Sequence, residues 1–445
     1  KSFILPIKST LMNFQWENLS RGLLGMLFLV GLCYILSNNK KAINWKLVLM
    51  GIVAQLAFAI GVLSQGKYNF FRILIQWLSD QFVQVINLAH KGIEFMFGNL
   101  ADASGSWGYT FAIQALPNII FFAALSSLFY YLGILQKIVY FFALLLSKLK
   151  VSGAESVSTA ANIFLGQTEA PLMVRPFLEK MNRSEILCIM VGGMANTAGS
   201  VLAAYVGFLG GSDIVQQHYF ALHLLSQSIM SAPAAIVCSK ILFPQTEQID
   251  ERIILSKEKF GENALDAISL GTTDGLKLAV NVGAILVVFT ALMYVLNWVL
   301  GSFGYYLGLN NWIKSFSSGR YDSLSFQMLL GYLFSPIAWL IGVHQNDMIY
   351  VGQLLGEKTI INEFQAYITF GKMKSANVIT DPRSILITTY ALCGFANIAS
   401  IGIQIGGISQ LAPNQRKNLT ELGFKALIGG TIACLMCACI AGALG

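Results

Sequence analysis

Long, uninterrupted apolar stretches most strongly limit how this chain can fold. They recur between residues 22 and 444, and short polar or basic segments separate them. A helix needs about 20 apolar residues to cross the hydrocarbon core of a bilayer. The stretches do not alternate between polar and apolar residues, as the strands of a transmembrane β-barrel would. The pattern therefore predicts an all-α polytopic membrane protein embedded in a lipid bilayer.

The composition excludes the other broad classes. Of the 445 residues, 55% are hydrophobic and 11% are charged, against roughly 25% charged residues in an ordinary soluble domain. These values exclude a disordered chain, a coiled coil, a fibrous repeat and a disulfide-rich secreted domain. The net charge of +7 comes from basic clusters between apolar stretches, so we expect a membrane topology signal and no nucleic acid partner.

Eight stretches are expected to cross the membrane. The first has no cleavage-site pattern, so we expect it to remain as a span. Apolar residues at helical spacing over 70–97 predict an amphipathic helix that lies in the interface or packs across the bundle. The strongly charged segment 244–263 predicts a solvated loop. The expected spans are 22–36, 47–63, 119–146, 186–209, 218–243, 274–300, 385–408 and 422–444.

Basic clusters orient these spans. In this threading all the clusters fall on one side of the membrane, and both termini fall on the other side. The positive-inside rule assigns the basic side to the cytoplasm. The clusters are Lys40/Lys41/Lys46, Lys148/Lys150, Lys180/Arg183, Arg252/Lys257/Lys259 and Arg416/Lys417.

The segment 151–181 is too polar and too broken to form a simple span. Gly166 and Pro171 interrupt the helix on either side of the triplet Gln167-Thr168-Glu169. A carboxylate at membrane depth is costly, so it persists where it faces water, an ion, a partner or a substrate. The alternative is a short cytoplasmic loop with ordinary polar residues.

The segment 324–373 is broken in the same way. Its centre runs from Gly356 to Phe364 and holds three charged residues, Glu357, Lys358 and Glu363. Lys358 is expected to pair with Glu357 at the break. The apolar neighbours of Glu363 indicate that this side chain is buried, and the alternative is an acidic residue in an exposed loop.

A broken segment, a helix with a polar centre and a further span occur in this order twice. The polar centres hold Asn196 and Thr197 in the first half, and Asn397 and Ser400 in the second. Repeats with discontinuous helices and polar groups at mid-membrane are typical of secondary transporters. Re-entrant hairpins allow irregular backbone at depth where protein or a water cavity surrounds it. For the asparagines and Ser400, interhelical hydrogen bonds are the alternative role.

The repeat divides the chain into an inverted-repeat transport core and a scaffold. The scaffold comprises 1–118, with two spans and the amphipathic helix, and 244–322, with the charged loop and the sixth span. The first half of the core is 119–243, with the third span, the first hairpin and two further spans. The second half is 323–445, with the second hairpin and the last two spans.

Other functions fit the sequence less well. A channel places rings of carbonyls or charges on a symmetry axis, whereas the two hairpin acids lie in different halves of one chain. An enzyme is not expected, because the histidines form no metal-ligand pattern and no nucleophile motif is present. The seven cysteines are expected to pack as small core residues. A carrier for another polar solute is an alternative that these features do not exclude. The histidines are His90, His218, His223 and His344.

Several motifs resemble the concentrative nucleoside transporter family. The run Gly-Gln-Thr-Glu-Ala-Pro at 166–171 matches the first hairpin of the family, and Asn362-Glu363-Phe364 matches the second. Gly394-Phe395-Ala396-Asn397 with Ser400 matches the seventh span. The resemblance runs in order from about residue 119 to the C-terminus. Further matches are Ala198-Gly199-Ser200-Val201-Leu202, Pro336-Ile337-Ala338-Trp339-Leu340 and Leu411-Ala412-Pro413-Asn414.

The resemblance implies an eight-span protomer of the bacterial branch, assembled as a homotrimer in the inner (cytoplasmic) membrane. It implies cation-coupled uptake of nucleosides by alternating access, in which the hairpin-containing core moves against the scaffold. The expected coupling ion is Na⁺, and no organic cofactor is expected. Proton-coupled symport of nucleosides is the alternative.

The same resemblance implies which residues bind the nucleobase. Gln167 and Thr168 would bind its edge, since an amide and a hydroxyl offer both donors and acceptors. Glu169 would reach the base side partly through water, and Val201 would line the base pocket.

The sugar contacts are also implied by the resemblance. Glu363 would accept charge-assisted hydrogen bonds from the ribose hydroxyls. Asn397 and Ser400 would complete these contacts, and Phe395 would supply an aromatic wall.

The cation site of the family uses oxygens from the first hairpin and the following span. Here Asn162 and Asn196 would give side-chain oxygens, and Leu165 and Thr197 would give backbone carbonyls. Neutral oxygens suit a hard monovalent cation such as Na⁺. The position of Asn196 usually holds a small hydroxyl residue in sodium-coupled members, and this departure keeps proton coupling through a carboxylate as the alternative.

Overall fold

The computed structural model describes residues 16–63, 69–102, 110–211, 213–256 and 261–445. Throughout these residues the regular structure is helical, which confirms the predicted all-α fold. Seven helical segments of this part are long and apolar enough to cross a membrane. Six of them match predicted spans, and the seventh, 111–131, overlaps only the first part of the predicted span 119–146. The span predicted over 385–408 consists of two shorter helices.

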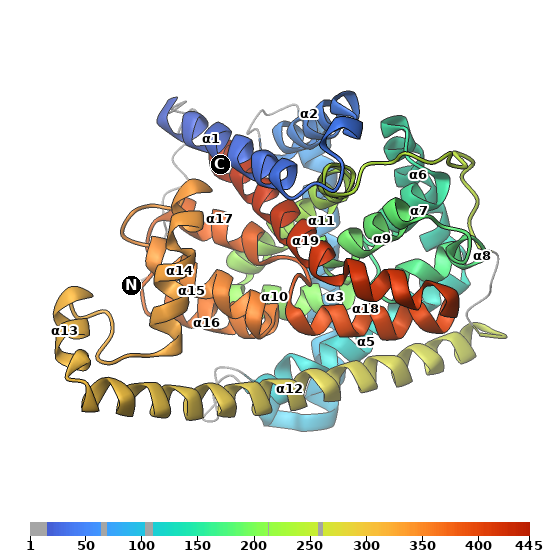
Figure 1. Ribbon diagram of the computed structural model, residues 1–445. Helices are drawn as coiled ribbons and strands as arrows, with labels where there is room; N and C mark the ends of the chain where they lie inside the picture. The colour runs from blue at the N-terminus through green and yellow to red at the C-terminus, as the bar shows by residue number, and fades with distance from the viewer. Residues whose placement is uncertain (1–15, 64–68, 103–109, 212, 257–260) are drawn as a thin grey trace.

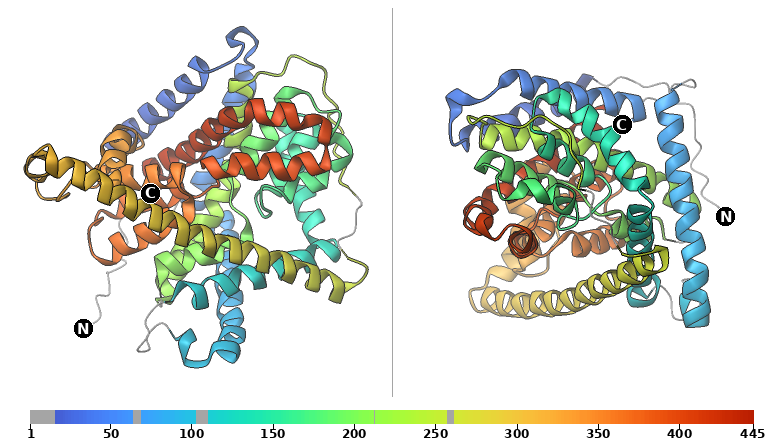
Figure 2. Two further views of the ribbon diagram at one scale, coloured as in Figure 1. Left: turned by 60° about the horizontal axis from the view of Figure 1, so that its bottom comes forward. Right: turned by 90° about the vertical axis from the view of Figure 1, so that its right-hand side faces the viewer.

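Three long helices open the fold. α1 (Trp16–Ile35) and α2 (Trp45–Leu63) follow each other along one side, at the top of Figure 1. α3 (Phe70–Phe97) covers the predicted amphipathic segment and stands upright at the edge of the right-hand view in Figure 2. Its buried residues, among them Ile75 and Ala89, recur at helical spacing. α3 packs against α11 as well as α2, which favours packing across the bundle over a purely interfacial position.

The third predicted span, 119–146, is two helices, so the prediction of one span is wrong. After the short α4 (Phe111–Gln114), α5 (Leu116–Tyr131) ends before Gly133, and α6 (Ile134–Leu146) begins after it. Gly133 has φ +73°, a left-handed conformation that a helix interior does not contain. One glycine among apolar residues is therefore enough to turn the chain.

The first broken segment forms a hairpin. α7 (Gly153–Ala161) ends at Asn162, and the chain returns through η4 (Ala170–Val174) and α8 (Arg175–Leu178). The next predicted span is interrupted at 196–198, between α9 (Arg183–Ala195) and α10 (Gly199–Gly210). α11 (Ile214–Leu242) then crosses the middle of the molecule. Asn196 thus stands in a true helix break, where sequence analysis expected a continuous span.

The longest helix lies in the sequence between the two parts of the chain that contain the hairpins. α12 (Ala264–Tyr306) has 43 residues, includes the predicted span 274–300, and runs along the lower edge of Figure 1 against α5. Of the 18 most apolar consecutive residues of α12, only 17% are buried, whereas 94% are buried in the corresponding stretch of α9 and α10. α12 is therefore a peripheral element, while α9 and α10 are enclosed by protein. α13 (Leu309–Phe316) and α14 (Phe326–Leu340) follow it.

The second half repeats the order of the first. α15 (Met348–Ile360) and α16 (Glu363–Ser375) form the second hairpin. α17 (Pro382–Leu392) and α18 (Ile398–Leu411) are separated by a break at 393–397. α19 (Arg416–Leu444) packs against α9, α11, α17 and α18. Helices from both interrupted segments therefore pack against α19.

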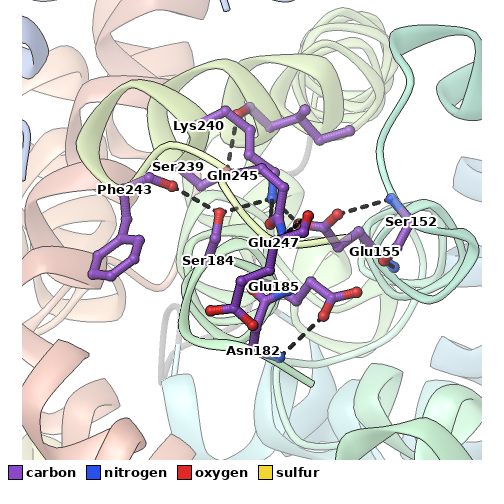
Figure 3. Close-up of polar contacts among 11 residues, drawn as sticks. Ser152, Glu155, Asn182, Ser184, Glu185, Ser239, Lys240, Phe243, Gln245 and Glu247 are labelled. Carbon is purple, nitrogen blue, oxygen red and sulfur yellow. Dashed lines mark hydrogen bonds and ion pairs between the residues drawn. The ribbon is translucent and has the colours of Figure 1, made fainter. Parts of the chain in front are cut away.

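A buried ion pair attaches the first hairpin to α11 (Figure 3). Lys240 Nζ lies 2.5 Å from Glu155 Oε1, and the two side chains are 4% and 0% exposed. Lys240 Nζ also donates to Ser184 Oγ (2.9 Å) and Gln245 Oε1 (3.1 Å). Glu155 Oε2 accepts from the backbone N–H of Ser152 (2.9 Å), which caps α7. Each charge is thus matched and hydrogen-bonded, as burial requires.

The charged segment after α11 lies across this hairpin. The N–H of Gly153 donates to the carbonyl of Asp250 (2.8 Å), and the N–H of Ser256 donates to the carbonyl of Met173 (2.9 Å). Arg252 holds the pKa of Asp250 at about 2 by side-chain hydrogen bonding, so this exposed carboxylate stays ionised. We call 244–256 the strap. The predicted solvated loop is therefore bound to both arms of the hairpin over its described part, and 257–260 lie outside the described residues.

Candidate functional site

The second hairpin places a carboxylate at a helix N-terminus. Asn362 caps α16 by accepting the N–H of Gln365 (2.9 Å), so Glu363 is the first residue of that helix. The positive end of a helix dipole favours a carboxylate there. Glu363 is 3% exposed, which confirms the predicted burial. Asn397 Nδ2 donates to Glu363 Oε2 at 2.7 Å, and the Tyr205 hydroxyl donates to Oε1 at 3.4 Å.

The break between α17 and α18 fixes the orientation of Asn397. Its Oδ1 accepts the N–H of Ser400 (2.8 Å) and caps α18. The amide Nδ2 is consequently left to face Glu363. The cap and the carboxylate contact therefore use opposite ends of one amide group.

The tip of the first hairpin reaches the same place. Gln167 Nε2 donates to Ser400 Oγ at 3.1 Å, and Gln167 Oε1 is buried without a partner. Glu169 Oε2 accepts the N–H of Gly166 (3.1 Å), so this exposed carboxylate closes the turn of the hairpin. The methyl group of Thr168 packs against Gly407, where an added Cβ would lie 2.7 Å away.

The two halves of the chain thus meet in one hydrogen-bonded network. It joins the first hairpin, the α17–α18 break, the second hairpin and α10. Within a buried site it offers an amide oxygen, two hydroxyls and a carboxylate to a polar solute. The network comprises Gln167, Ser400, Asn397, Glu363 and Tyr205.

Sequence reasoning did not identify Tyr205. It is fully buried, and its ring stacks on that of Tyr367 with centroids 4.3 Å apart. The available signal was a hydroxyl-bearing aromatic residue inside an otherwise small and apolar span. The remaining predicted residues flank the network. Val201 is 1% exposed in the first turn of α10, and the N–H of Phe395 donates to the carbonyl of Asn196 (3.2 Å).

Two further polar side chains hold the helix breaks together. Gln227 Nε2 donates to the carbonyls of Ala195 (3.3 Å) and Cys393 (2.9 Å), which lie at the ends of α9 and α17. Lys358 Nζ donates to the carbonyl of Ala391 (2.8 Å). An amide and an ammonium group therefore satisfy carbonyls that the breaks leave without intrahelical partners.

Lys358 does not pair with Glu357, so that expectation is wrong. The lysine points to the C-terminal end of α17, while Glu357 Oε1 accepts from Gln353 Nε2 at 2.9 Å. Neighbours in a helix sequence project in different directions, so adjacency does not bring their side chains together.

The predicted cation ligands surround the break between α9 and α10. Asn162 is 1% exposed, and neither its Oδ1 nor its Nδ2 has a hydrogen-bond partner. A Cβ added at Gly192 would lie 3.2 Å from Asn162 Nδ2, and Asn196 Nδ2 donates to the Gly192 carbonyl at 3.3 Å. The two asparagines therefore lie around one residue of α9. Asn196 Oδ1 also accepts the hydroxyl of Ser231.

The donor set fits a monovalent cation. Leu165 lies in the hairpin turn beyond Asn162, and Thr197 lies in the break between α9 and α10, with its hydroxyl 3.5 Å from Cys393 Sγ. Within the described residues, His, Cys, Asp and Glu form no cluster of three that would suit a transition metal. Neutral oxygens beside an unwound helix are the ligands that transporters present to Na⁺.

Two hairpins, two interrupted helices and a buried polar site at their junction define a secondary transporter. Sequence models described as Na⁺ dependent nucleoside transporter N-terminus and C-terminus match residues 24–100 and 223–442, and one described as nucleoside recognition matches 112–212. The chain belongs to the concentrative nucleoside transporter family, which confirms the resemblance seen in its motifs. This is a family of transporters and not of enzymes.

Named relatives and solved structures agree with this membership. An uncharacterized transporter of Haemophilus influenzae is 41% identical and the match covers 94% of this chain and 96% of the relative. Nucleoside permease NupC of Helicobacter pylori is 36% identical, with the same coverage of each chain. The inward-facing, substrate-bound structure of CNTnw is 36% identical, with a TM-score of 0.85 over 96% of this chain and 98% of that one.

Proposed function

We propose that this protein is a Na⁺-coupled symporter that carries nucleosides into the cell by alternating access. The main support for this proposal is the buried hydrogen-bonded network at the junction of the two hairpins, in a chain that belongs to a nucleoside transporter family. The Glu363 carboxylate, held by Asn397 and Tyr205, faces the site beside the neutral amide and hydroxyl groups of the network. Such a site suits a neutral solute that has several hydroxyl groups and a hydrogen-bonding edge.

The network separates the two ends of a nucleoside. Glu363, Asn397 and Ser400 would bind the ribose, because an ionised acceptor strengthens hydrogen bonds from hydroxyl groups. Phe395 supplies the aromatic wall beside them.

The base would lie toward the first hairpin. Gln167 has a buried amide oxygen without a partner, which is available to a base donor. Thr168 and Glu169 would contact the base edge, Glu169 partly through water, and Val201 would line the pocket.

Asn162, Leu165, Asn196 and Thr197 would hold the Na⁺ ion. The support is the buried amide of Asn162, whose oxygen has no partner and which lies against α9 near Asn196. An ion there would join the first hairpin to the α9–α10 break and so order the hairpin tip that bears Gln167. Proton coupling through a carboxylate remains the second candidate, because Asn196 replaces the usual small hydroxyl residue.

Alternating access would move the enclosed core against the peripheral helices. The exposed apolar face of α12, with Val287 71% and Trp298 72% exposed, suits contact with lipid and with neighbouring subunits of a homotrimer. The strap, which precedes this helix in the chain, is bound to the first hairpin.

The basic side would face the cytoplasm, with the protein in the inner membrane. The loops that carry the basic clusters contact one another at one end of the bundle. The N–H of Asn38 donates to the carbonyl of Leu242 (3.0 Å), Arg183 pairs with Glu421 (2.7 Å), and Gln415 Nε2 donates to the carbonyl of Leu178 (3.0 Å). This convergence supports the orientation given by the positive-inside rule.

Calorimetric titration of uridine tests the coupling ion. In detergent-purified protein at fixed pH, Na⁺ should tighten uridine binding relative to choline, and Asn162→Ala should abolish that difference while retaining weak binding. Equal affinity in Na⁺ and choline, together with tighter binding at lower pH, would favour the proton-coupled alternative. Binding of other polar solutes but no nucleoside would contradict the substrate class.

A further inference from the structure

Glu357 is a buried acid that the proposed transport site does not use. It lies on α15, the arm of the second hairpin opposite Glu363, and is 1% exposed. Its Oε1 accepts one hydrogen bond, from Gln353 Nε2 at 2.9 Å, and its Oε2 is buried without a partner. The carboxyl group therefore has one neutral donor and an oxygen that nothing in the described residues satisfies.

No described cation offsets a charge on this group. Lys358, the next residue, donates to the Ala391 carbonyl on α17. Arg320 lies over the ring of Tyr350 at 5.7 Å and forms no ion pair with Glu357. At the far ends of the packed helices, Lys374 donates to the carbonyl of Leu209 and Arg383 to that of Gly442.

Several other titratable groups on the elements packed against α15 have partners of their own. Tyr321, before α14, donates its hydroxyl to Gln353 Oε1 (3.3 Å) and so orients the amide that faces Glu357. On α16, Tyr367 donates to the Thr389 carbonyl (2.8 Å), and Glu363 is held by Asn397. On α17, Tyr390 contacts His223.

The comparison with Glu363 shows what Glu357 lacks. Glu363 has two donors and lies at a helix N-terminus, whereas Glu357 has one neutral donor and lies in the last turn of α15. A negative charge is disfavoured near the C-terminal end of a helix. An ionised carboxylate in the membrane interior costs several kcal/mol unless it is paired. The neutral acid removes that cost, which the neutral hydroxyl of Thr369 on α16, a donor to the ionised form, offsets only in part.

We propose that Glu357 is a proton-binding site whose protonation removes an uncompensated charge from the second hairpin within the bilayer. The proton is taken from water and stays on the carboxyl oxygen while the hairpin is enclosed. Ionisation of Glu357 leaves an unpaired charge beside the site and slows the movement of the hairpin. This consequence for transport rests on the proposed nucleoside symport, whereas the protonation itself does not.

Infrared difference spectroscopy of the protein in lipid bilayers tests the protonation. At neutral pH the wild type should show the carbonyl stretch of a protonated carboxylic acid, and Glu357→Gln should lose it. Glu363→Gln is the matched control on the same hairpin and should retain the band. Equal bands in the wild type and Glu357→Gln would overturn the proposal. The measurement needs no substrate, so its outcome is independent of whether nucleosides are transported.

Uptake against pH tests the consequence. With equal pH on both sides and a constant Na⁺ gradient, wild-type uptake should decline by about tenfold per pH unit above the titration of Glu357. Glu357→Gln should remove that decline, and Glu357→Met, an apolar residue of similar length, should do the same if the amide variant does not fold. A decline as steep in either folded variant as in the wild type would overturn the role in transport.

Discussion

At the scale of single residues, three acids of the hairpins are held in three different ways. Glu363 has two side-chain donors at a helix N-terminus, Glu169 accepts a backbone N–H of its own turn, and Glu357 has one neutral donor. These partners decide which acid can serve as a charged acceptor for a solute. Glu363 is the one with enough donors to remain ionised in a buried site.

Replacing Glu363 by Gln should weaken nucleoside binding by about 10- to 100-fold. Hydrogen bonds to charged groups contribute roughly 1.5–3 kcal/mol, and a neutral amide loses that contribution with the ribose hydroxyls. Calorimetric titration with uridine measures the change. The matched control is Glu421→Gln, which removes an exposed pair with Arg183 and should leave affinity unchanged. An unchanged affinity in Glu363→Gln would remove this residue from the sugar site.

Sequence reasoning singled out Glu363, Asn397 and Gln167 as polar residues among apolar neighbours, and the family resemblance implied their roles. It did not identify Tyr205 or Gln227, whose partners are distant in the chain. Tyr205 contacts Glu363 on the other half, and Gln227 joins carbonyls of two different breaks. A local pattern cannot show such pairings, because they arise when the two repeats pack against each other.

At the scale of elements, the first hairpin is attached to its surroundings at its base. The buried pair of Glu155 and Lys240 joins α7 to α11, and the strap binds both arms of the hairpin. Helix breaks were harder to predict than hairpins. Gly133 ends α5 without any polar signal, and the polar centres at 196–198 and 393–397 were expected to lie within continuous helices.

Glu155→Gln should destabilise the protein by about 3–5 kcal/mol, because it leaves the buried Lys240 ammonium without its counter-charge. The amide retains an oxygen for the Ser152 cap, so the loss reports on the ion pair. Thermal unfolding in detergent should show a lower midpoint. The double variant Glu155→Gln with Lys240→Met should recover part of the loss. A double variant less stable than the single one would contradict this account of the pair.

Gly153→Ala should displace the strap from the first hairpin. A Cβ at Gly153 would lie 1.8 Å from the backbone carbonyl oxygen of Arg252, a distance that forces the backbone to move. Limited proteolysis should then cut within 244–256 faster than in the wild type. Gly31→Ala is the control, since a Cβ there has no atom within 4 Å. Equal cleavage rates in the wild type and Gly153→Ala would show that the strap is not bound as described.

At the scale of the whole molecule, enclosed and peripheral helices form two groups. α9 and α10 are almost entirely surrounded by protein, whereas α12 exposes most of its apolar length. This contrast agrees with the predicted division into core and scaffold, which stays a prediction: the helices that carry the site are shielded, and the long helix is not. The repeat in the sequence suggested such a division, but it gave no sign of the length of α12 or of the path of the strap.

Distances between the core and α12 should change with ligands if the core moves. Spin labels on Lys180→Cys, at the base of the first hairpin, and Leu292→Cys, on the exposed face of α12, report the movement. The native cysteines are all buried and should not label. A label pair within α12, at Leu276→Cys and Leu292→Cys, should give a constant distance. A core-to-α12 distance that stays constant with Na⁺, with uridine and with both would contradict a moving core.

The most direct test is uptake of radiolabelled uridine into proteoliposomes with an imposed Na⁺ or H⁺ gradient, for the wild type and Glu363→Gln. We predict uptake that an inward Na⁺ gradient drives, that unlabelled uridine competes with, and that Glu363→Gln loses. Uptake driven by the H⁺ gradient alone would show that the coupling ion is H⁺ and not Na⁺, while the nucleoside site would stand as proposed. No uptake under either gradient, with folded protein in the membrane, would contradict nucleoside symport by this chain.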